Sequence, residues 1–390
     1  MVLTRKNIEQ LSWAEMDKFV LAMHRIQQLP PDHPDSYFVI AGYHGEPFRG
    51  AGYGNASWWG GYCNHGNILF PTWHRAYLLR LEKALQNQVP GVTLPYWNEI
   101  DDTTKQSGIP SIYLAETYTF QDQKVIPNPL RSYRYQKTIK DRLSVPYPDE
   151  EQYNTDYSKP AGKTTCRFPF SGLWGPNDSI TTEAHNKKME ENGIVWTNEQ
   201  LNRNVKAWLN DITYETSQGN RLGADLRKKF EKCLEAPNYT VFSNTTSAQR
   251  WNDDHADMVG FLPAVSLESP HNGMHLAIGG IQVPAQDASA IPDANGDMAE
   301  NDTASFDPIF YLHHAFIDLM FWRWQIINEQ TNELRIESEF VHYPGTNSVD
   351  AQGPTPGVPG NKWLTLDDTL DPFGLKSKVG LSLGENNMHD

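Results

Sequence analysis

The fold and chemistry of this chain centre on the stretch Leu267-Glu268-Ser269-Pro270-His271-Asn272-Gly273-Met274-His275, followed by Phe306-Asp307-Pro308-Ile309-Phe310-Tyr311-Leu312-His313-His314. On a helix, residues four apart share a face, with Cβ atoms about 5–6 Å apart, so His271 and His275 can reach one metal ion. A third imidazole can then arrive from the second stretch on a neighbouring helix. The two stretches together predict a three-histidine metal site.

Three further histidines cluster nearer the N-terminus. His44, His65 and His74 lie in segments rich in aromatic and apolar residues. A lone helical pair such as His271 and His275 more often packs or faces solvent than binds a metal. Two trios are much harder to explain by packing, and we predict that they form one binuclear site.

The predicted ligand set narrows the choice of metal. Imidazole suits zinc, copper, iron and nickel, whereas calcium and magnesium prefer oxygen ligands. Copper(II) binds most tightly of these divalent ions to a given nitrogen site. Six neutral ligands leave the charge of two metal ions uncompensated, so the pair should attract a small bridging anion such as hydroxide. This composition favours copper and dioxygen chemistry.

These motifs resemble the type-3 copper proteins, the family of tyrosinases, catechol oxidases (polyphenol oxidases) and molluscan haemocyanin units. The resemblance covers nearly the whole chain and is closest to short fungal and bacterial forms. The segments that carry it are Cys63-Asn64-His65 to His74-Arg75, Leu94-Pro95-Tyr96-Trp97, Glu268 to His275, Phe306 to His314, and Leu364 to Phe373.

The resemblance implies two copper ions, CuA and CuB, with dioxygen as co-substrate. Each copper would take three histidines: His44, His65 and His74 for CuA, and His271, His275 and His314 for CuB. His313 would not be a ligand, because in the family the second histidine of such a pair binds copper. Adjacent helical side chains point about 100° apart, so only one of the two can face the site. His313 and Asp307 would instead support the ligands from the second shell of residues.

The resemblance also implies roles for residues beside the ligands. Cys63 would form a thioether with His65, although a small buried free cysteine is the alternative. Glu268 and Asn272 would be catalytic, holding a water that accepts the proton of a monophenol. For Glu268 the alternative is a favourable charge at a helix N-terminus. The substrate pocket would be lined by Leu276, Asn301 and Phe310.

The resulting functional prediction is a dicopper polyphenol oxidase. It would oxidise o-diphenols to o-quinones with dioxygen and also o-hydroxylate monophenols, as a tyrosinase does. The alternatives are a catechol oxidase without appreciable monophenolase activity, a haemocyanin-like dioxygen carrier, and a structural zinc protein, which would seldom lack cysteine ligands. Asn98 follows Tyr96-Trp97 where the family usually has Asp. Departures of this kind leave the choice between monophenols and diphenols open.

The composition fits a soluble enzyme for small phenolic substrates. A net charge of −15 over 390 residues argues against nucleic acid and against an anionic membrane surface as partners. No apolar run is long enough to span a membrane, and Met1 to Val20 lacks the apolar core of a signal peptide. We therefore expect a cytoplasmic protein as written, or a secreted one if this is a mature form. The sequence leaves open the oligomeric state and whether Cys166 and Cys233 pair.

The expected fold is mainly α, with a four-helix bundle core that holds the dicopper centre, long surface loops and a few short strands. Ligands from distant parts of the chain must meet, so we expect one catalytic domain over residues 1–390. A surface tail would follow about residue 375, with no C-terminal shielding domain.

Several local patterns predict where helices begin. Ser12 and Glu15 form a capping box, as do Thr197 and Gln200. Helices are also expected at Ser36 to Tyr43, from Pro71, at Ala224 to Glu235, and from Asp307 as N-cap with Pro308 in the first turn. The span from Asp101 to Val195 has no sustained periodicity and is expected to form surface loops.

Overall fold

The computed structural model describes residues 3–53, 60–140, 158–176, 178–210, 213–215, 221–223, 225–280, 296–336, 349–350, 353–354 and 364–377. Its α-helices are α1 (Trp13–Gln28), α2 (Tyr37–Gly42), α3 (Phe70–Gln88), α4 (Asp102–Ser107), α5 (Ser179–Glu191), α6 (Ile194–Leu209), α7 (Leu226–Cys233), α8 (Tyr239–Ser243), α9 (Thr245–His255), α10 (Glu268–Gly279) and α11 (Ile309–Ile327).

The remaining elements are short. The 3-10 helices are η1 (Ile8–Gln10), η2 (Ala51–Tyr53), η3 (Ser111–Tyr113), η5 (Asp297–Ala299) and η6 (Ala304–Phe306). The strands pair as antiparallel two-stranded units: β1 (Thr117–Thr119) with β2 (Val125–Pro127), β3 (Thr213–Glu215) with β4 (Arg221–Gly223), β5 (Val349–Asp350) with β6 (Gly353–Pro354), and β7 (Thr369–Leu370) with β8 (Leu375–Lys376). The prediction of a mainly helical fold with a few short strands is confirmed.

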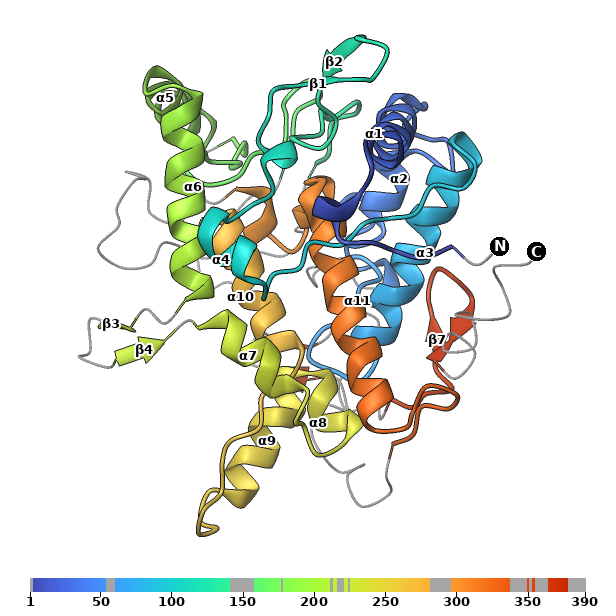
Figure 1. The fold of residues 1–390 in the computed structure, drawn as a ribbon, viewed down its shortest axis with the longest axis vertical. Coiled ribbons are helices and arrows are strands. Elements are labelled where there is room, and N and C mark those ends of the chain that lie inside the picture. The colour runs from blue at the N-terminus through green and yellow to red at the C-terminus, as the bar shows by residue number, and fades with distance from the viewer. Residues whose placement is uncertain are drawn as a thin grey trace.

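The helices that matter for function lie at the centre of the molecule. Helix α11 packs against α3, and α3 packs against α1 on its other side. Helix α10 lies across from α11, backed by α6 and α7 (Figure 1). Helices α3, α10 and α11, with the end of α2, therefore surround one interior region to which distant parts of the chain contribute.

Helix α11 is apolar enough to be buried along most of its length. Leu312, Phe316, Met320 and Trp324 are each completely buried. Trp322, on the outer face of the helix, is 40% exposed. The helix begins at Ile309, one residue later than expected, and the side chain of Asp307 still accepts a hydrogen bond from the Ile309 amide at 3.1 Å.

The first predicted capping box is confirmed. The Glu15 amide donates to Ser12 Oγ at 3.3 Å, and the Ser12 amide donates to Glu15 Oε2 at 2.8 Å. Two of the four unpaired amides at the start of α1 are thereby satisfied. Helix α2 begins as predicted after Ser36, whose Oγ accepts from the Val39 amide.

The second predicted capping box is wrong. Helix α6 begins at Ile194, after Gly193 with a φ of 84°, and ends at Leu209. Thr197 lies inside the helix, where its hydroxyl donates to the Gly193 and Ile194 carbonyls. A glycine that adopts positive φ without strain fixes this helix start earlier than the threonine pattern indicated.

The prediction that Asp101 to Val195 forms only loops is wrong in part. Helices α4 and α5 and the pair β1–β2 lie in this span. Helix α5 buries only Thr182, His185 and Met189, of which one is apolar. Hydrophobic periodicity cannot detect a helix whose buried stripe is mostly polar.

Other expectations concern the chain ends and cysteines. The predicted surface tail lies mostly outside the described residues, which end at Ser377. Cys166 and Cys233 are both free thiols, so the possible disulfide between them is not formed. Among the described helices, none combines the length and apolar character needed to cross a membrane.

Candidate metal centre

The structure brings all six predicted ligand histidines into the interior region between the central helices. His74 projects from α3, His271 and His275 from α10, and His314 from α11. His44 follows α2 by two residues, and His65 lies on the loop before α3. Five of them are buried, and His275 is partly buried. Helix spacing placed His271 and His275 on one face, as predicted.

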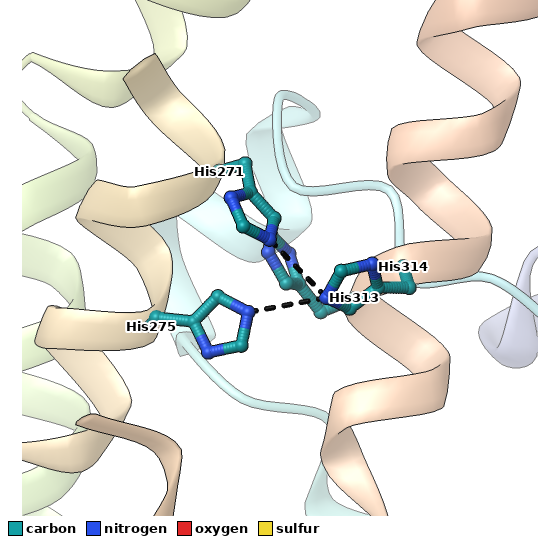
Figure 2. A group of neighbouring side chains, drawn as sticks. All are labelled: His271, His275, His313 and His314. Carbon is teal, nitrogen blue, oxygen red and sulfur yellow. Dashed lines mark hydrogen bonds between the residues drawn. The ribbon is translucent and has the colours of Figure 1, made fainter. Parts of the chain in front are cut away.

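The CuB histidines converge on a common point (Figure 2). His271 Nε2 lies 3.2 Å from His314 Nε2, and His275 Nε2 lies 3.1 Å from the same atom. Nitrogens bound to one metal ion at about 2.0–2.1 Å are themselves roughly 3 Å apart. The trio therefore has the nitrogen spacing of a metal site.

The hydrogen bonds made by the Nδ1 atoms of these rings determine whether the converging Nε2 atoms carry a proton. His271 Nδ1 lies 2.8 Å from Asn272 Oδ1, and His275 Nδ1 lies 2.8 Å from the Met298 carbonyl oxygen. An oxygen acceptor holds the proton on Nδ1, which leaves Nε2 as a lone pair. His314 Nε2 carries at most one proton, so it can donate to only one of the two. A cation among the three nitrogens accounts for both contacts.

The CuA histidines form a second trio. Their ring centroids lie 5.3 Å apart for His44 and His65, 5.6 Å for His44 and His74, and 5.1 Å for His65 and His74. His44 Nδ1 faces the Asn301 carbonyl at 3.0 Å and His74 Nδ1 faces the Phe70 carbonyl at 2.8 Å. The Nε2 atoms of His44 and His74 are buried without a hydrogen-bond partner among the described residues. Buried lone pairs of this kind are suited to a metal ion.

Burial keeps these imidazoles neutral. It lowers the pKa of His65 and of His275 to about 3, and it lowers the pKa of the other four ligand histidines well below the usual value. The neighbouring histidines add to the effect in each case. A neutral imidazole is the form that binds a metal, so the site needs no deprotonation at neutral pH.

The two trios adjoin each other. The His74 ring stacks on the His314 ring at 4.6 Å and 20°, and the His65 ring lies 6.0 Å from the His271 ring. These contacts join α3 and its preceding loop to α10 and α11. The predicted binuclear arrangement is thus supported by the packing of one trio on the other.

Cys63 lies beside the CuA histidines. Potential ligand atoms of His44, Cys63 and His65 all lie within 4.8 Å of one another. Burial raises the pKa of the Cys63 thiol to about 12, and Asn301 Nδ2 lies 3.7 Å from its sulfur. The thiol is therefore uncharged in the folded chain, and the thioether with His65 stays a prediction.

His313 neighbours all three CuB histidines, and one of its ring nitrogens lies within 4.8 Å of a ring nitrogen of each. Its Nδ1 shares a hydrogen bond with Glu99 Oε1 at 2.7 Å, and both side chains are completely buried. Its ring lies parallel to that of His271, 5.3 Å away at 18°. Burial lowers the pKa of His313 to about 3 and raises that of Glu99 well above its usual value. The contact with Glu99 occupies His313 Nδ1, and the supporting role of His313 behind the ligands stays a prediction.

Glu268 and Asn272 both contact the elements that carry ligands. The Gly66 amide donates to Glu268 Oε1 at 2.8 Å, and the Thr245 amide and hydroxyl donate to Oε2 at 2.9 and 3.1 Å. Glu268 therefore ties the loop of His65 to the start of α9. Asn272 orients His271 through the hydrogen bond to Nδ1.

The residues predicted to line the substrate pocket differ in burial. Leu276 and Asn301 are partly buried, whereas Phe310 is completely buried. The Phe310 ring stacks on His314 at 3.9 Å and 22° and meets His44 edge-on at 4.9 Å. Phe310 thus contacts one histidine of each trio.

Some functional groups carried no signal in the sequence. The carbonyl oxygens of Phe70, Met298 and Asn301 orient ligand histidines, but any residue could supply a carbonyl. Glu99 was also missed. Its position in an apolar segment, directly after the unusual Asn98, could have indicated a buried role, since a buried carboxyl needs a polar partner.

Comparison with known proteins shows which family this chain resembles. A family model described as the common central domain of tyrosinase matches residues 34–327. A tyrosinase of Aspergillus oryzae is 51% identical over 383 residues, covering 95% of this chain and 68% of that protein. A tyrosinase of Hahella is 45% identical over 382 residues, covering 94% of this chain and 66% of that protein. The chain thus spans about two thirds of the length of these relatives.

Solved structures agree with the sequence relatives. The tyrosinase from Burkholderia thailandensis at low pH superposes with a TM-score of 0.81 at 40% sequence identity. The match covers 98% of this chain and 73% of that structure. Fold and sequence therefore lead to one family.

Proposed function

Because the chain belongs to the tyrosinase family of copper oxidoreductases, we propose that it uses dioxygen to oxidise o-diphenols to o-quinones and also hydroxylates monophenols at the ortho position. The observation that carries the proposal is the convergence of six neutral imidazoles, five buried and one partly buried, in two adjoining trios. His44, His65 and His74 would hold CuA, and His271, His275 and His314 would hold CuB.

The copper pair, when bound, would supply the redox chemistry that passes electrons from the phenol to dioxygen. The chain supplies orientation. Acceptors behind four of the rings hold the Nδ1 protons, so that the Nε2 lone pairs face the site: Phe70 O, Asn272 Oδ1, Met298 O and Asn301 O. Fixed ligand tautomers raise metal affinity and limit reorganisation during turnover.

Monophenol hydroxylation also requires removal of the phenol proton. Glu268 is the buried carboxylate nearest in sequence to the CuB ligands, and its Oε1 contacts the amide beside His65. We propose that Glu268, with Asn272 on the next turn, holds a water that receives this proton. Leu276 and Asn301 would contact the phenol ring, and Phe310 would support the site from below.

The proposed activity is tested by measuring dioxygen consumption and quinone formation with tyramine and with catechol in parallel. Turnover of both, with a lag before quinone forms from tyramine, is the expected result. Catechol turnover alone would identify a catechol oxidase. Stoichiometric dioxygen binding without turnover of either phenol would identify a carrier and contradict the proposal.

The proposed role of Glu268 predicts a selective defect. Glu268→Gln keeps the side-chain shape but removes the charge, so kcat/KM for tyramine should fall by about 100-fold or more, with a much smaller loss for catechol. Thr245→Ala is the matched control, because it removes one hydroxyl donor to Glu268 and keeps the carboxylate. Unchanged hydroxylation in Glu268→Gln would exclude the role.

A further inference from the structure

The segment between the two ligand helices α10 and α11 has an unusual arrangement of buried charge. We call Gly296 to Asp307 the strap. Three of its buried carboxylates stand at intervals of five residues, and each pairs with a buried cation from outside the strap: Asp297 with Lys159 at 3.0 Å, Asp302 with Arg49 at 2.9 Å, and Asp307 with Arg167 at 2.6 Å.

Such pairs are poor sources of stability. Removing two charges from water costs several kcal/mol per ion, which the attraction between them only partly offsets. Both members of each pair are at most 7% exposed, so this cost applies in full. An ion pair in the interior is better suited to fixing one arrangement of the chain.

Two of the three carboxylates stand next to the carbonyls that orient ligand histidines. Asp297 precedes Met298, whose carbonyl faces His275 Nδ1 at 2.8 Å. Asp302 follows Asn301, whose carbonyl faces His44 Nδ1 at 3.0 Å. One end of the strap therefore contacts a CuB histidine, and its middle contacts a CuA histidine.

We propose that Lys159 and Arg49 are positioning residues, each of which sets the orientation of one ligand histidine at one copper. Lys159 acts through Asp297 and the Met298 carbonyl on His275, and Arg49 acts through Asp302 and the Asn301 carbonyl on His44. The inference rests on the proposed dicopper function and extends it to residues that are remote in sequence from every ligand except His44.

Further hydrogen bonds fix the two anchoring carboxylates. Asp297 also accepts from the Tyr135 hydroxyl at 3.0 Å and from the Cys166 amide at 2.7 Å. Asp302 accepts from the Gly60 amide at 2.6 Å. Neither carboxylate can therefore shift without breaking bonds to more than one segment of the chain.

The backbone of the strap also packs closely against neighbouring backbone segments. A Cβ placed on Gly279, at the end of α10, would lie 2.2 Å from the Ala299 nitrogen. A Cβ placed on Gly45, beside His44, would lie 2.3 Å from the Asp302 carbonyl oxygen. Because the strap touches the neighbouring backbones this closely, a change in its anchors moves the carbonyls that face the ligands.

The third pair differs from the other two. Arg167 donates to both oxygens of Asp307, which stands at the entrance to α11. Among the described residues, no ligand histidine forms a hydrogen bond with a carbonyl next to Asp307. Arg167 therefore serves as the comparison residue for a buried ion pair whose carboxylate does not adjoin a carbonyl that faces a ligand histidine.

The test separates the two coppers by removing one site at a time in the full chain. His44→Ala leaves an intact CuB trio, and His275→Ala leaves an intact CuA trio. Copper(II) affinity is then measured by chelator competition after adding Lys159→Met or Arg49→Met to each background. The same substitution is thus compared in both backgrounds, so a general loss of folding would appear in both.

Lys159→Met should weaken copper binding about 10- to 100-fold where only CuB remains, and Arg49→Met should do the same where only CuA remains. In the opposite backgrounds each change should stay within about threefold, as for uncoupled sites. Arg49→Lys, which keeps the charge, should recover most of the CuA affinity. Arg167→Met should show no preference for either background.

Equal losses in both backgrounds, or no loss in either, would overturn the proposal. If Lys159→Met does not fold, Tyr135→Phe removes one donor to Asp297 without exposing a charge and should give the same CuB preference, with a smaller loss. Failure of the proposed function looks different, because neither single-site background would then bind copper at all.

Discussion

At the scale of single residues, the chemistry depends on which nitrogen each imidazole presents. His271 and His275 were recognisable from their spacing, but their tautomers are set by Asn272 and by the Met298 carbonyl. The first is a side chain visible in the sequence. The second is a backbone atom of a segment more than twenty residues away, which only the fold brings to the ligand.

Cys63 gives the first prediction at this scale. The intact mass of the copper-loaded, air-exposed chain should be two hydrogens lower than the sequence mass, because a thioether to His65 forms with loss of two hydrogens. Cys166 and Cys233 are free, so no disulfide contributes to this difference. The variant Cys63→Ser should show the full sequence mass. A wild-type chain at full sequence mass would leave Cys63 as a simple buried thiol.

At the scale of elements, helix ends were predictable where side chains supply the caps. Ser12, Ser36 and Asp307 accept hydrogen bonds from helix-start amides as their positions indicated. Thr197 does not, because Gly193 starts α6 earlier.

This difference predicts two contrasting stability effects. Ser12→Ala removes a capping hydroxyl and should lower the free energy of unfolding by about 1 kcal/mol. Thr197→Ala removes only a hydroxyl bonded within its own helix and should change it by less than about 0.5 kcal/mol. Urea unfolding of the metal-free chain measures both. A larger loss for Thr197→Ala would mean that the cap assignment in α6 is wrong.

The ligand set and the helical class could be predicted because each depends on residue type and spacing. His74 follows Pro71 at the start of α3, and His314 follows Asp307-Pro308 before α11, so local signals placed both ligands on helices. The polar helix α5 and the strap could not be predicted. Asp297 and Asp302 look like surface acids until Lys159 and Arg49, from distant segments, are placed against them.

At the scale of the whole molecule, the buried histidines link stability to pH. The six ligand histidines have a folded-state pKa below the unfolded value of about 6.5. Their contribution to stability is complete above that pH and is lost as the pH falls, because the unfolded chain takes up protons first.

The metal-free chain should therefore unfold cooperatively between about pH 6 and pH 4, with a slope of up to about 8 kcal/mol per pH unit if all six histidines protonate. Saturating copper should move the midpoint to lower pH, because the metal binds the folded state and competes with protons. Circular dichroism over a pH series, with and without copper, measures the shift. A metal-free chain equally stable at pH 7 and pH 4.5 would contradict the neutral buried histidines.

The most direct test of the dicopper centre is the number of copper ions bound per chain. After reconstitution and removal of loosely bound metal, the wild-type chain should hold two copper ions, His314→Ala should hold one, and His313→Ala should hold two with lower stability. One copper per wild-type chain, or equal copper loss from His313→Ala and His314→Ala, would contradict the assignment of six histidines to two copper ions.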